Sequence, residues 1–120
     1  MAEARTEDTE RVARRYFEAW TSRDSDTVAS VLDPDFRFAA GGGMVVQGRE
    51  AVLEAGAFPK DATTALLAEA YQGDIGFQLY ESTRGDRSVL IAEKLTVRDG
   101  RIVDSMFVTD MAAFGAFMAP

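Results

Sequence analysis

The hydrophobic periodicity of this chain is mainly that of helices in its first half and that of strands in its second. Between residues 6 and 20 the apolar positions recur at intervals of three and four, which predicts an amphipathic helix with Thr6 as its N-cap. A second short helix follows residues 22–25 and ends at Asp33 and Pro34, because the residue before proline avoids the α region. A third helix begins at Gly48 and ends near residues 56–59.

Alternation with a period of two predicts strands in the rest of the chain. Phe36, Phe38 and Ala40 alternate in one strand, and from Thr63 onward strands follow one another with turns at residues 73–74, 85–86 and 99–100. The tail after Asp110 is expected to form a short capped helix or an apolar flap. Three helices followed by a long meander predict an α+β fold, a cone-shaped curved sheet, antiparallel or mixed, wrapped around the three N-terminal helices as an α+β barrel.

Length and charge limit what this chain can do. With 120 residues we expect one domain spanning residues 1–120, and a hydrophobic fraction of 47% excludes disorder. A formal net charge of -7 argues against nucleic acid or an anionic membrane as a partner, because phosphates are bound by clustered Lys and Arg. The charged N-terminal segment and the lack of an apolar stretch of bilayer length lead us to expect a cytoplasmic protein.

Two residue types are missing altogether, and their absence restricts the chemistry. Without Cys there is no thiol nucleophile or thiolate metal site, and without His there is no Ser-His-Asp triad or imidazole ligand. Acid-base work is left to Asp, Glu, Tyr, Lys and Arg. The Asp and Glu residues are scattered without ligand spacing and no nucleotide motif follows a strand, so we expect neither a metal nor an organic cofactor.

One carboxylate lies in register with a buried strand face. Val89, Ile91, Leu95 and Val97 define that face, and Glu93 falls on it. Burial raises the pKa of a carboxyl and favours its neutral form, which can donate a hydrogen bond, so Glu93 is a candidate acid in an apolar cavity. The alternative is that Glu93 lies at a dimer interface or pairs with an arginine.

A second carboxylate follows a similar pattern on the preceding strand. Ile75, Phe77 and Leu79 share one strand face, and Glu81 continues it, which predicts that Glu81 points into the same cavity. The alternative places Glu81 on a solvated rim, because it lies close to a turn.

The register across the turn at Asp99 and Gly100 decides which residues of the last strand face Glu93. A two-residue loop places one alternating set on that face, namely Ile102, Asp104, Met106 and Val108. A three-residue loop with a glycine bulge places the other set there, namely Val103, Ser105, Phe107 and Thr109. Composition does not choose between them.

The segments at residues 15–20, 24–32, 35–38, 48–52 and 97–103 follow one another in an order that resembles the nuclear transport factor 2-like superfamily, in particular its SnoaL-like and ketosteroid isomerase-like branches. The resemblance covers nearly the whole chain. It implies the fold more strongly than an activity, because the superfamily includes isomerases, polyketide cyclases, epoxide hydrolases, dehydratases and pure binding modules.

The resemblance also assigns roles to single positions. Tyr16 matches the oxyanion-hole tyrosine of ketosteroid isomerases, Glu93 matches their protonated aspartate, and Ala40 stands where they carry the catalytic base. Against limonene epoxide hydrolases, Glu81 matches one acidic catalytic residue, but Leu79 replaces the arginine and Phe107 the other aspartate.

SnoaL-type cyclases provide a third comparison of this kind. Asp110 matches the acidic residue that closes their final strand, although it is also well placed to cap a tail helix, and Ser105 replaces a common histidine. The resemblance favours the three-residue loop, with Ser105, Phe107 and Thr109 lining the cavity.

The leading hypothesis is a small acid-base enzyme, a cyclase or isomerase acting on an apolar, polyketide-like carbonyl compound. Tyr16 and neutral Glu93 would hold the substrate oxygen, and Glu81 or Asp110 would be the base, although Tyr16 also fits an ordinary core stripe. The side chains expected to contact the substrate are Trp20, Phe36, Phe38, Phe77, Leu79, Ser105, Phe107 and Thr109.

The alternative is a protein of the same fold without catalysis. Its aromatic side chains could fill the cavity, leaving a small-ligand-binding module or a dimeric scaffold. For either hypothesis we expect a small hydrophobic molecule as partner and a homodimer, formed through outward-facing apolar residues of the sheet such as Leu90, Ala92, Met106 and Val108.

Overall fold

The computed structural model describes residues 2–56 and 59–120. Its helices are α1 (Ala2–Thr21), α2 (Ser25–Val31), α3 (Arg49–Ala55) and α4 (Met111–Met118), with a short 3₁₀ turn at Gly41–Gly43. Its strands are β1 (Leu32–Ala39), β2 (Val45–Gln47), β3 (Thr63–Gln72), β4 (Ile75–Arg84), β5 (Arg87–Arg98) and β6 (Arg101–Thr109). Apart from β2 and the 3₁₀ turn, which the sequence analysis did not predict, these elements match the predicted order, and the tail is a helix.

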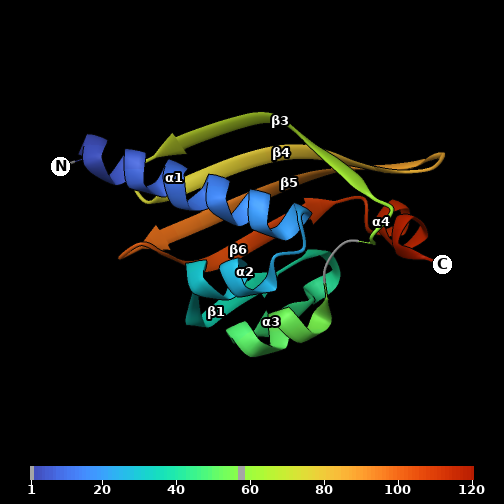
Figure 1. Cartoon of the computed structure of the whole chain (residues 1–120), viewed down its shortest axis with the longest axis horizontal. Helices are drawn as coiled ribbons and strands as arrows, with labels where there is room; N and C mark the ends of the chain where they lie inside the picture. The colour runs from blue at the N-terminus through green and yellow to red at the C-terminus, as the bar shows by residue number, and fades with distance from the viewer. Residues whose placement is uncertain (1, 57–58) are drawn as a thin grey trace.

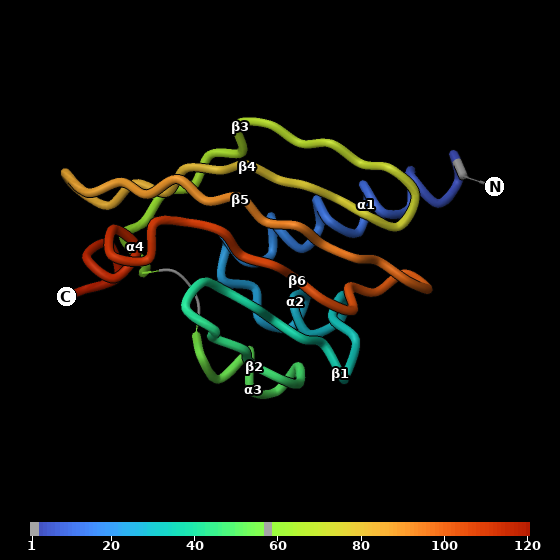
Figure 2. Tube along the Cα trace, turned by 180° about the vertical axis from the view of Figure 1, so that it is seen from behind, coloured from blue at the N-terminus to red at the C-terminus, as the bar shows by residue number. Residues whose placement is uncertain are grey.

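All strands join one six-stranded sheet in the order β2-β1-β6-β5-β4-β3. Of the strands in the described residues, only β1 and β6 pair in parallel, so the sheet is mixed. The long strands form one curved layer, and α1 runs along its concave side with α2 and α3 beside it (Figure 1). The view from behind shows the strands in front of these helices (Figure 2). The predicted α+β cone is therefore confirmed, but the sheet ends at β2 and β3 and does not close into a barrel.

The first helix begins at Ala2, five residues before Glu7, which would be its first residue if Thr6 were the N-cap. Thr6 is not an N-cap, because its hydroxyl accepts a hydrogen bond from the Gly73 N–H at 2.9 Å, one turn inside the helix. Thr9 donates to the Gly73 carbonyl at 2.7 Å, so the turn between β3 and β4 holds the start of α1. A contact between residues so distant in sequence is invisible to local capping rules. The predicted end of the third helix falls partly on residues 57–58, which lie outside the described residues, and α3 ends at Ala55.

The hairpin between β5 and β6 combines features of both predicted registers. Arg98 pairs with Arg101 across a two-residue turn, in which Asp99 and Gly100 both have positive φ. The pairing then shifts within the strands: Val97 faces Ile102, whereas Thr96 faces Asp104. The extra residue on β6 is a bulge, and it reverses the alternation that follows. As a result Ser105 and Phe107 face the same side as Glu93, as the three-residue loop predicted, although the loop itself has two residues.

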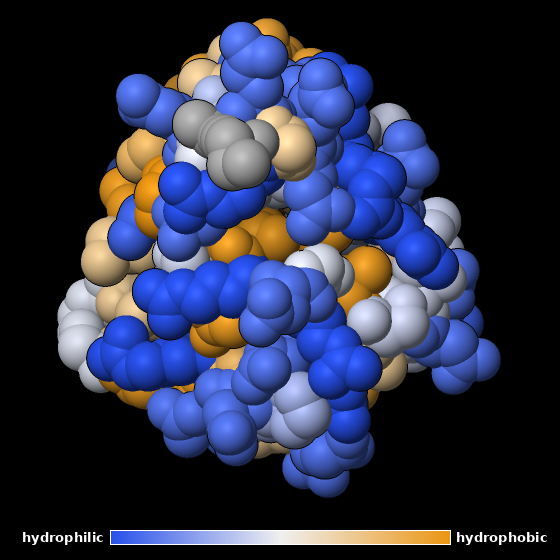
Figure 3. Space-filling model, turned by 90° about the vertical axis from the view of Figure 1, so that its left-hand side faces the viewer, coloured by the Kyte–Doolittle hydropathy of each residue, from blue (hydrophilic) through white to orange (hydrophobic). Residues whose placement is uncertain are grey.

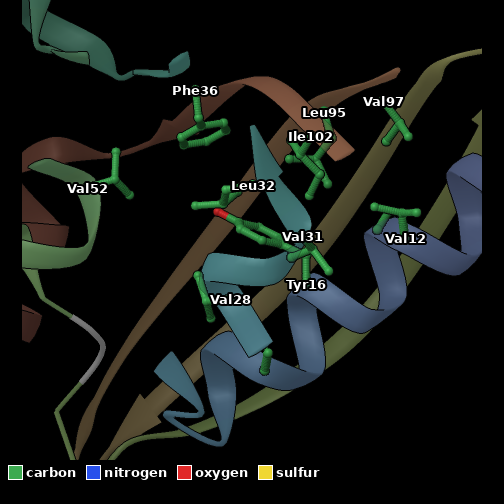
Figure 4. Packing of buried hydrophobic residues seen from close by; sticks show 12 residues of the cluster. Val12, Tyr16, Val28, Val31, Leu32, Phe36, Val52, Leu95, Val97 and Ile102 are labelled. Carbon is green, nitrogen blue, oxygen red and sulfur yellow. The ribbon is translucent and has the colours of Figure 1, made fainter. Parts of the chain in front are cut away.

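The core lies between α1 and the sheet. One cluster is built around Tyr16, Phe36 and Leu32, and Figure 4 shows the Tyr16 side chain extending from α1 toward Leu32. A second cluster lies nearer the C-terminal helix and contains Tyr80, Val89, Ile91, Phe107 and Phe117.

The end of the molecule that carries the N-terminus is covered mainly by hydrophilic side chains, with hydrophobic ones visible between them (Figure 3). Among the described residues, no helix is long and apolar enough to cross a membrane.

Candidate active site

A single buried carboxyl collects hydrogen bonds from three different elements. Glu93 lies on the inner face of β5 and is 2% exposed. The hydroxyl of Tyr80 in β4 donates to its Oε1 at 2.9 Å, and the hydroxyl of Tyr16 in α1 donates to its Oε2 at 3.2 Å. Ser105 in β6 also donates to Oε2. The partners of Glu93 are therefore neutral hydroxyls, and no described arginine forms an ion pair with it.

Burial and hydrogen bonding act in opposite directions on Glu93. Removal from water raises the pKa of its carboxyl, and the hydrogen bonds from Ser105, Tyr80 and Tyr16 oppose this increase without cancelling it. Burial and the nearby carboxyl also raise the pKa of both tyrosines well above the usual range. Both tyrosine hydroxyls thus keep their protons at neutral pH, and Glu93 is the group whose proton can be exchanged.

An apolar cavity of about 120 Å³ lies next to this cluster. Tyr80 and Glu93 form part of its wall, and the rest of the lining consists of apolar or small residues: Trp20, Phe38, Ala40, Met44, Gly56, Phe107, Met111, Phe114 and Met118. Phe107 connects the two sides of the cavity, because its ring contacts those of Phe38 and Phe114 with centroids 5.5 Å and 5.2 Å away. A ligand in this cavity would contact the Glu93 carboxyl and the Tyr80 hydroxyl in an otherwise apolar environment.

Helix α4 closes one side of the cavity and is held at both ends. Asp110 caps its N-terminus, accepting hydrogen bonds from the N–H groups of Ala112 and Ala113 at 3.0 Å each. Arg84 in β4 donates to the carbonyls of Phe117 and Ala119 at 3.1 Å and 2.8 Å, where a cation also complements the helix dipole. The wall that α4 contributes therefore depends on contacts formed outside the cavity.

Comparison with known proteins identifies the family. The sequence model of the SnoaL-like domain matches residues 13–105, more than three quarters of the chain. The chain belongs to the SnoaL-like domain family. A search of curated proteins found no match.

Solved structures similar to this SnoaL-like domain share its fold at low sequence identity. A protein from Kribbella flavida proposed to be a ketosteroid isomerase is 23% identical with a TM-score of 0.83, covering 88% of this chain and 79% of its own. A proposed SnoaL-like polyketide cyclase from Jannaschia sp. is 18% identical with a TM-score of 0.81, covering 97% and 95%. An LEH-like epoxide hydrolase from M. tuberculosis is 18% identical with a TM-score of 0.73, covering 94% and 90%. These similarities establish the fold of the domain. Its activity has to be inferred from the geometry of the site.

Several predicted site residues of the SnoaL-like domain lie together at the cavity. Trp20, Phe38, Phe107 and Glu93 line it, and Ser105 contacts Glu93. Tyr16 also contacts Glu93, but its ring is part of the core and it is not among the lining residues. The structure thus brings Tyr16 and Glu93 together as expected, but Tyr16 reaches the cavity only through Glu93, and its predicted contact with a substrate oxygen stays a prediction.

The prediction that Phe77, Leu79 and Glu81 lie on the inner face of β4 is also wrong. Phe77 is 54% exposed and Glu81 is exposed as well, because the inner face of this strand carries Gln78 and Tyr80 instead. Leu79 shares the outer face with them. The outer face of β4 carries large apolar residues and was therefore predicted to be the buried one. The inner face contains polar residues and a glycine.

Three further residues lie away from the cavity. Phe36 is fully buried in the other core cluster. Thr109 donates to the Leu90 carbonyl at 2.7 Å and is not among the lining residues, and Asp110 is exposed at its capping position. The expectation that Phe36 and Thr109 line the cavity is wrong, and Asp110 has the capping role that was the alternative.

Tyr80 is the functional candidate that the sequence analysis missed. It pairs with Ile91 across β4 and β5, two positions from the Gln78–Glu93 pair and so on the same face of the sheet. A signal was present, because counting back from Glu93 through the turn at residues 85–86 with a two-residue loop places Gln78, Tyr80 and Ser82 on the face of Glu93.

Proposed function

We propose that this SnoaL-like domain is an acid-base enzyme that moves a proton on a small apolar carbonyl compound, as an isomerase or a cyclase. One observation carries the proposal: a buried carboxyl and a tyrosine hydroxyl, 2.9 Å apart, form the polar part of an otherwise apolar cavity. A carboxyl whose pKa is raised by burial exchanges protons closer to neutral pH, where a general base is most effective.

Glu93 is the group that accepts the proton. Neither Glu81 nor Asp110 reaches the cavity, and among the described lining residues only Glu93 and Tyr80 can ionise. The Glu93 carboxylate takes a proton from the carbon next to the substrate carbonyl, and the electron pair of that C–H bond becomes an enolate. As Glu93 becomes neutral, it accepts the Tyr80 hydrogen bond less strongly. The Tyr80 hydroxyl can then donate to the enolate oxygen.

The fate of the enolate decides between the two reaction types. If Glu93 returns the proton to a different carbon, the double bond moves and the reaction is an isomerisation. If the enolate carbon attacks a second carbonyl carbon of the same molecule, a C–C bond forms while the π bond of that carbonyl breaks. The new alkoxide oxygen then takes the proton back from Glu93, a ring has closed, and the reaction is a cyclisation. Both need the same proton transfer at Glu93.

The cavity limits the substrate by size and polarity. An engineered cavity of about 150 Å³ binds benzene, and the cavity here measures about 120 Å³. It therefore suits roughly one six-membered ring or a chain of similar volume. Since its other lining groups are apolar or small, the enclosed part of the substrate should carry no charge.

The test is hydrogen–deuterium exchange at carbon, which requires no knowledge of the natural substrate. Small cyclic ketones and enones are incubated with the protein in D₂O, and loss of the signal from protons next to the carbonyl is followed by NMR. We expect exchange that depends on the protein, is abolished by Glu93→Gln, and slows about 10²-fold or more in Tyr80→Phe. Glu81→Gln is the matched control and should exchange at the wild-type rate, because Glu81 is exposed on the outer face.

A binding protein without catalysis is the second candidate. It is favoured by the presence of only one carboxyl among the described lining residues and by the aromatic rings of Trp20, Phe38 and Phe107. Trp20 is the only tryptophan and lines the cavity, so its fluorescence reports binding directly. Ketones that quench the Trp20 fluorescence saturably, but whose carbon-bound protons the protein does not exchange, would favour the binding-protein hypothesis and contradict the enzyme hypothesis.

A further inference from the structure

A second polar side chain lies buried next to Glu93. Gln78 is in β4 and pairs directly with Glu93 of β5 in the antiparallel register. Both side chains are 2% exposed, so both point to the inner face of the sheet. Side chains directly opposite on antiparallel strands have Cβ atoms about 4.5–5.5 Å apart, close enough for these two polar groups to interact.

The orientation of the Gln78 amide is fixed by its neighbours. Its Nε2 donates to the Ala13 carbonyl in α1 at 3.2 Å and to the Tyr71 hydroxyl in β3 at 3.1 Å. A flipped amide would place Oε1 against the Ala13 carbonyl, and two acceptors cannot form a hydrogen bond. Oε1 therefore points away from Ala13.

The other end of this amide is unsatisfied. Gln78 Oε1 is fully buried and accepts no hydrogen bond from any described residue. A buried acceptor without a donor destabilises the fold, so its position calls for a donor.

Glu93 provides a donor when it is protonated. The three hydroxyls around it satisfy the carboxylate form, since all three donate to its oxygens. A neutral carboxyl has one O–H of its own, and this group needs an acceptor in a buried site. We propose that Gln78 Oε1 accepts the hydrogen bond of the protonated Glu93 carboxyl, directly or through one enclosed water, and that Gln78 is a positioning residue for the proton of Glu93.

A chain of hydrogen bonds runs from the Gln78 amide toward the surface. The Tyr71 hydroxyl accepts from Gln78 and donates to Glu69 at 2.9 Å, and Glu69 also pairs with Arg14 at 2.7 Å. Burial raises the pKa of Tyr71 to about 12, so its hydroxyl stays protonated and keeps this direction of donation. The chain links the buried amide to an ion pair at the surface.

The other groups around Glu93 do not titrate in its range. Of the residues that contact it, Tyr16 on α1 and Tyr80 on β4 are titratable, and the pKa of each is raised well above its usual range. Ser105 on β6 is neutral. Below the ordinary tyrosine pKa of 10.0, a protonation change in this cluster is therefore that of Glu93 itself. The role of Gln78 can be tested by its effect on that one titration.

The experiment measures the protonation of Glu93 in two variants. Gln78→Met keeps the length of the side chain and removes the acceptor, whereas Tyr71→Phe removes a hydroxyl that Gln78 contacts and keeps the acceptor. The Glu93 carboxyl is followed by its ¹³Cδ NMR shift and its infrared C=O band, both assigned by their loss in Glu93→Gln. We expect Gln78→Met to lower the pKa of Glu93 by roughly one unit, the effect of one hydrogen bond on one protonation state. Tyr71→Phe should change it by much less.

The opposite direction would overturn the inference. Replacing a polar neighbour by an apolar one raises a carboxyl pKa when no hydrogen bond is involved, so an unchanged or raised pKa in Gln78→Met contradicts the proposal. A shift of equal size in Tyr71→Phe would contradict it too.

A second measurement needs no change at Gln78. In the wild-type protein the ¹³Cδ shift of Gln78 should titrate with the same midpoint as Glu93, and Glu93→Gln should abolish that titration. If the ¹³Cδ shift of Gln78 does not change when Glu93 titrates, the inference is overturned. This holds even if the Gln78→Met variant does not fold. The inference concerns the site of the proposed function, but neither readout requires turnover, so failure of the exchange assay and failure of this test are separate results.

Discussion

Replacing Glu93 by glutamine should make the protein more stable relative to wild type as the pH rises. The pKa of Glu93 is raised above its ordinary value of 4.5 in the folded chain, mainly by burial. The folded state therefore binds this proton more tightly than the unfolded state does. The stability that this proton contributes is fully present below pH 4.5 and is lost as the pH rises toward the folded-state pKa.

The size of the effect follows from proton linkage. Between pH 4.5 and the folded-state pKa, the free energy of unfolding of wild type falls by about 1.4 kcal/mol per pH unit through this group. Glutamine has no proton to lose, so its free energy of unfolding lacks this decrease. Near pH 4.5 the two proteins should differ by about 1 kcal/mol, because Tyr16, Tyr80 and Ser105 can reorient their hydroxyls toward an amide.

The assay is urea unfolding at half-unit steps from pH 4.5 to 8, monitored by the fluorescence of Trp20 at fixed protein concentration. The difference between Glu93→Gln and wild type should rise with pH and then level off, and the pH at which it levels off gives the folded-state pKa of Glu93. The carboxyls of Asp24, Asp61 and Glu69 have lowered pKa values and act in the opposite sense, but both proteins share them and they cancel.

The control is Glu81→Gln, which changes an exposed carboxyl on the outer face of the sheet and should leave the pH dependence as in wild type. A difference between Glu93→Gln and wild type that stays constant from pH 4.5 to 8 would refute the reasoning. It would mean that the three hydroxyls offset the cost of burying the charge.

Three further predictions concern elements around the cavity. Asp110→Ala should lower the free energy of unfolding by about 1 kcal/mol through loss of the α4 cap while leaving carbon-bound proton exchange unchanged, and a loss of exchange at full stability would instead indicate a catalytic role. Arg84→Gln should speed amide hydrogen exchange in α4 about tenfold, because two carbonyl contacts disappear, and unchanged protection would show that the remaining contacts, among them those from Arg87 to the Ala116 and Ala119 carbonyls, are enough to hold the helix. A homodimer through the outer face stays a prediction: Val108, 58% exposed, is the site for a lysine substitution that should convert a dimer into a monomer by light scattering, and a monomeric wild type would contradict it.

The sequence predicted the α+β fold because hydrophobic periodicity is a local property. The intervals of three and four in α1, the proline after α2 and the alternation around Glu93 each reflect one element burying one face. The burial of Glu93 followed from the same rule, since a strand presents every second residue to the same side.

The composition of the site depended on pairing between strands, which local patterns do not encode. On β4 the outer face carries Phe77 and Leu79, so the more hydrophobic face was taken for the inner one, and Glu81 was placed in the cavity instead of Tyr80. On β6 a bulge reversed the alternation after a two-residue turn, an event that neither simple register allowed.

The order of most elements, the α+β class and the burial of one carboxyl can be derived from the sequence, because each follows from the spacing of apolar residues within a single segment. The set of side chains around that carboxyl cannot, because it depends on how distant segments pack together. Tyr16, Gln78, Tyr80 and Ser105 come from three elements far apart in the chain, and they meet at Glu93 only because strand pairing and the packing of α1 fix their relative positions. A one-residue change of register would move any of the strand residues to the opposite face.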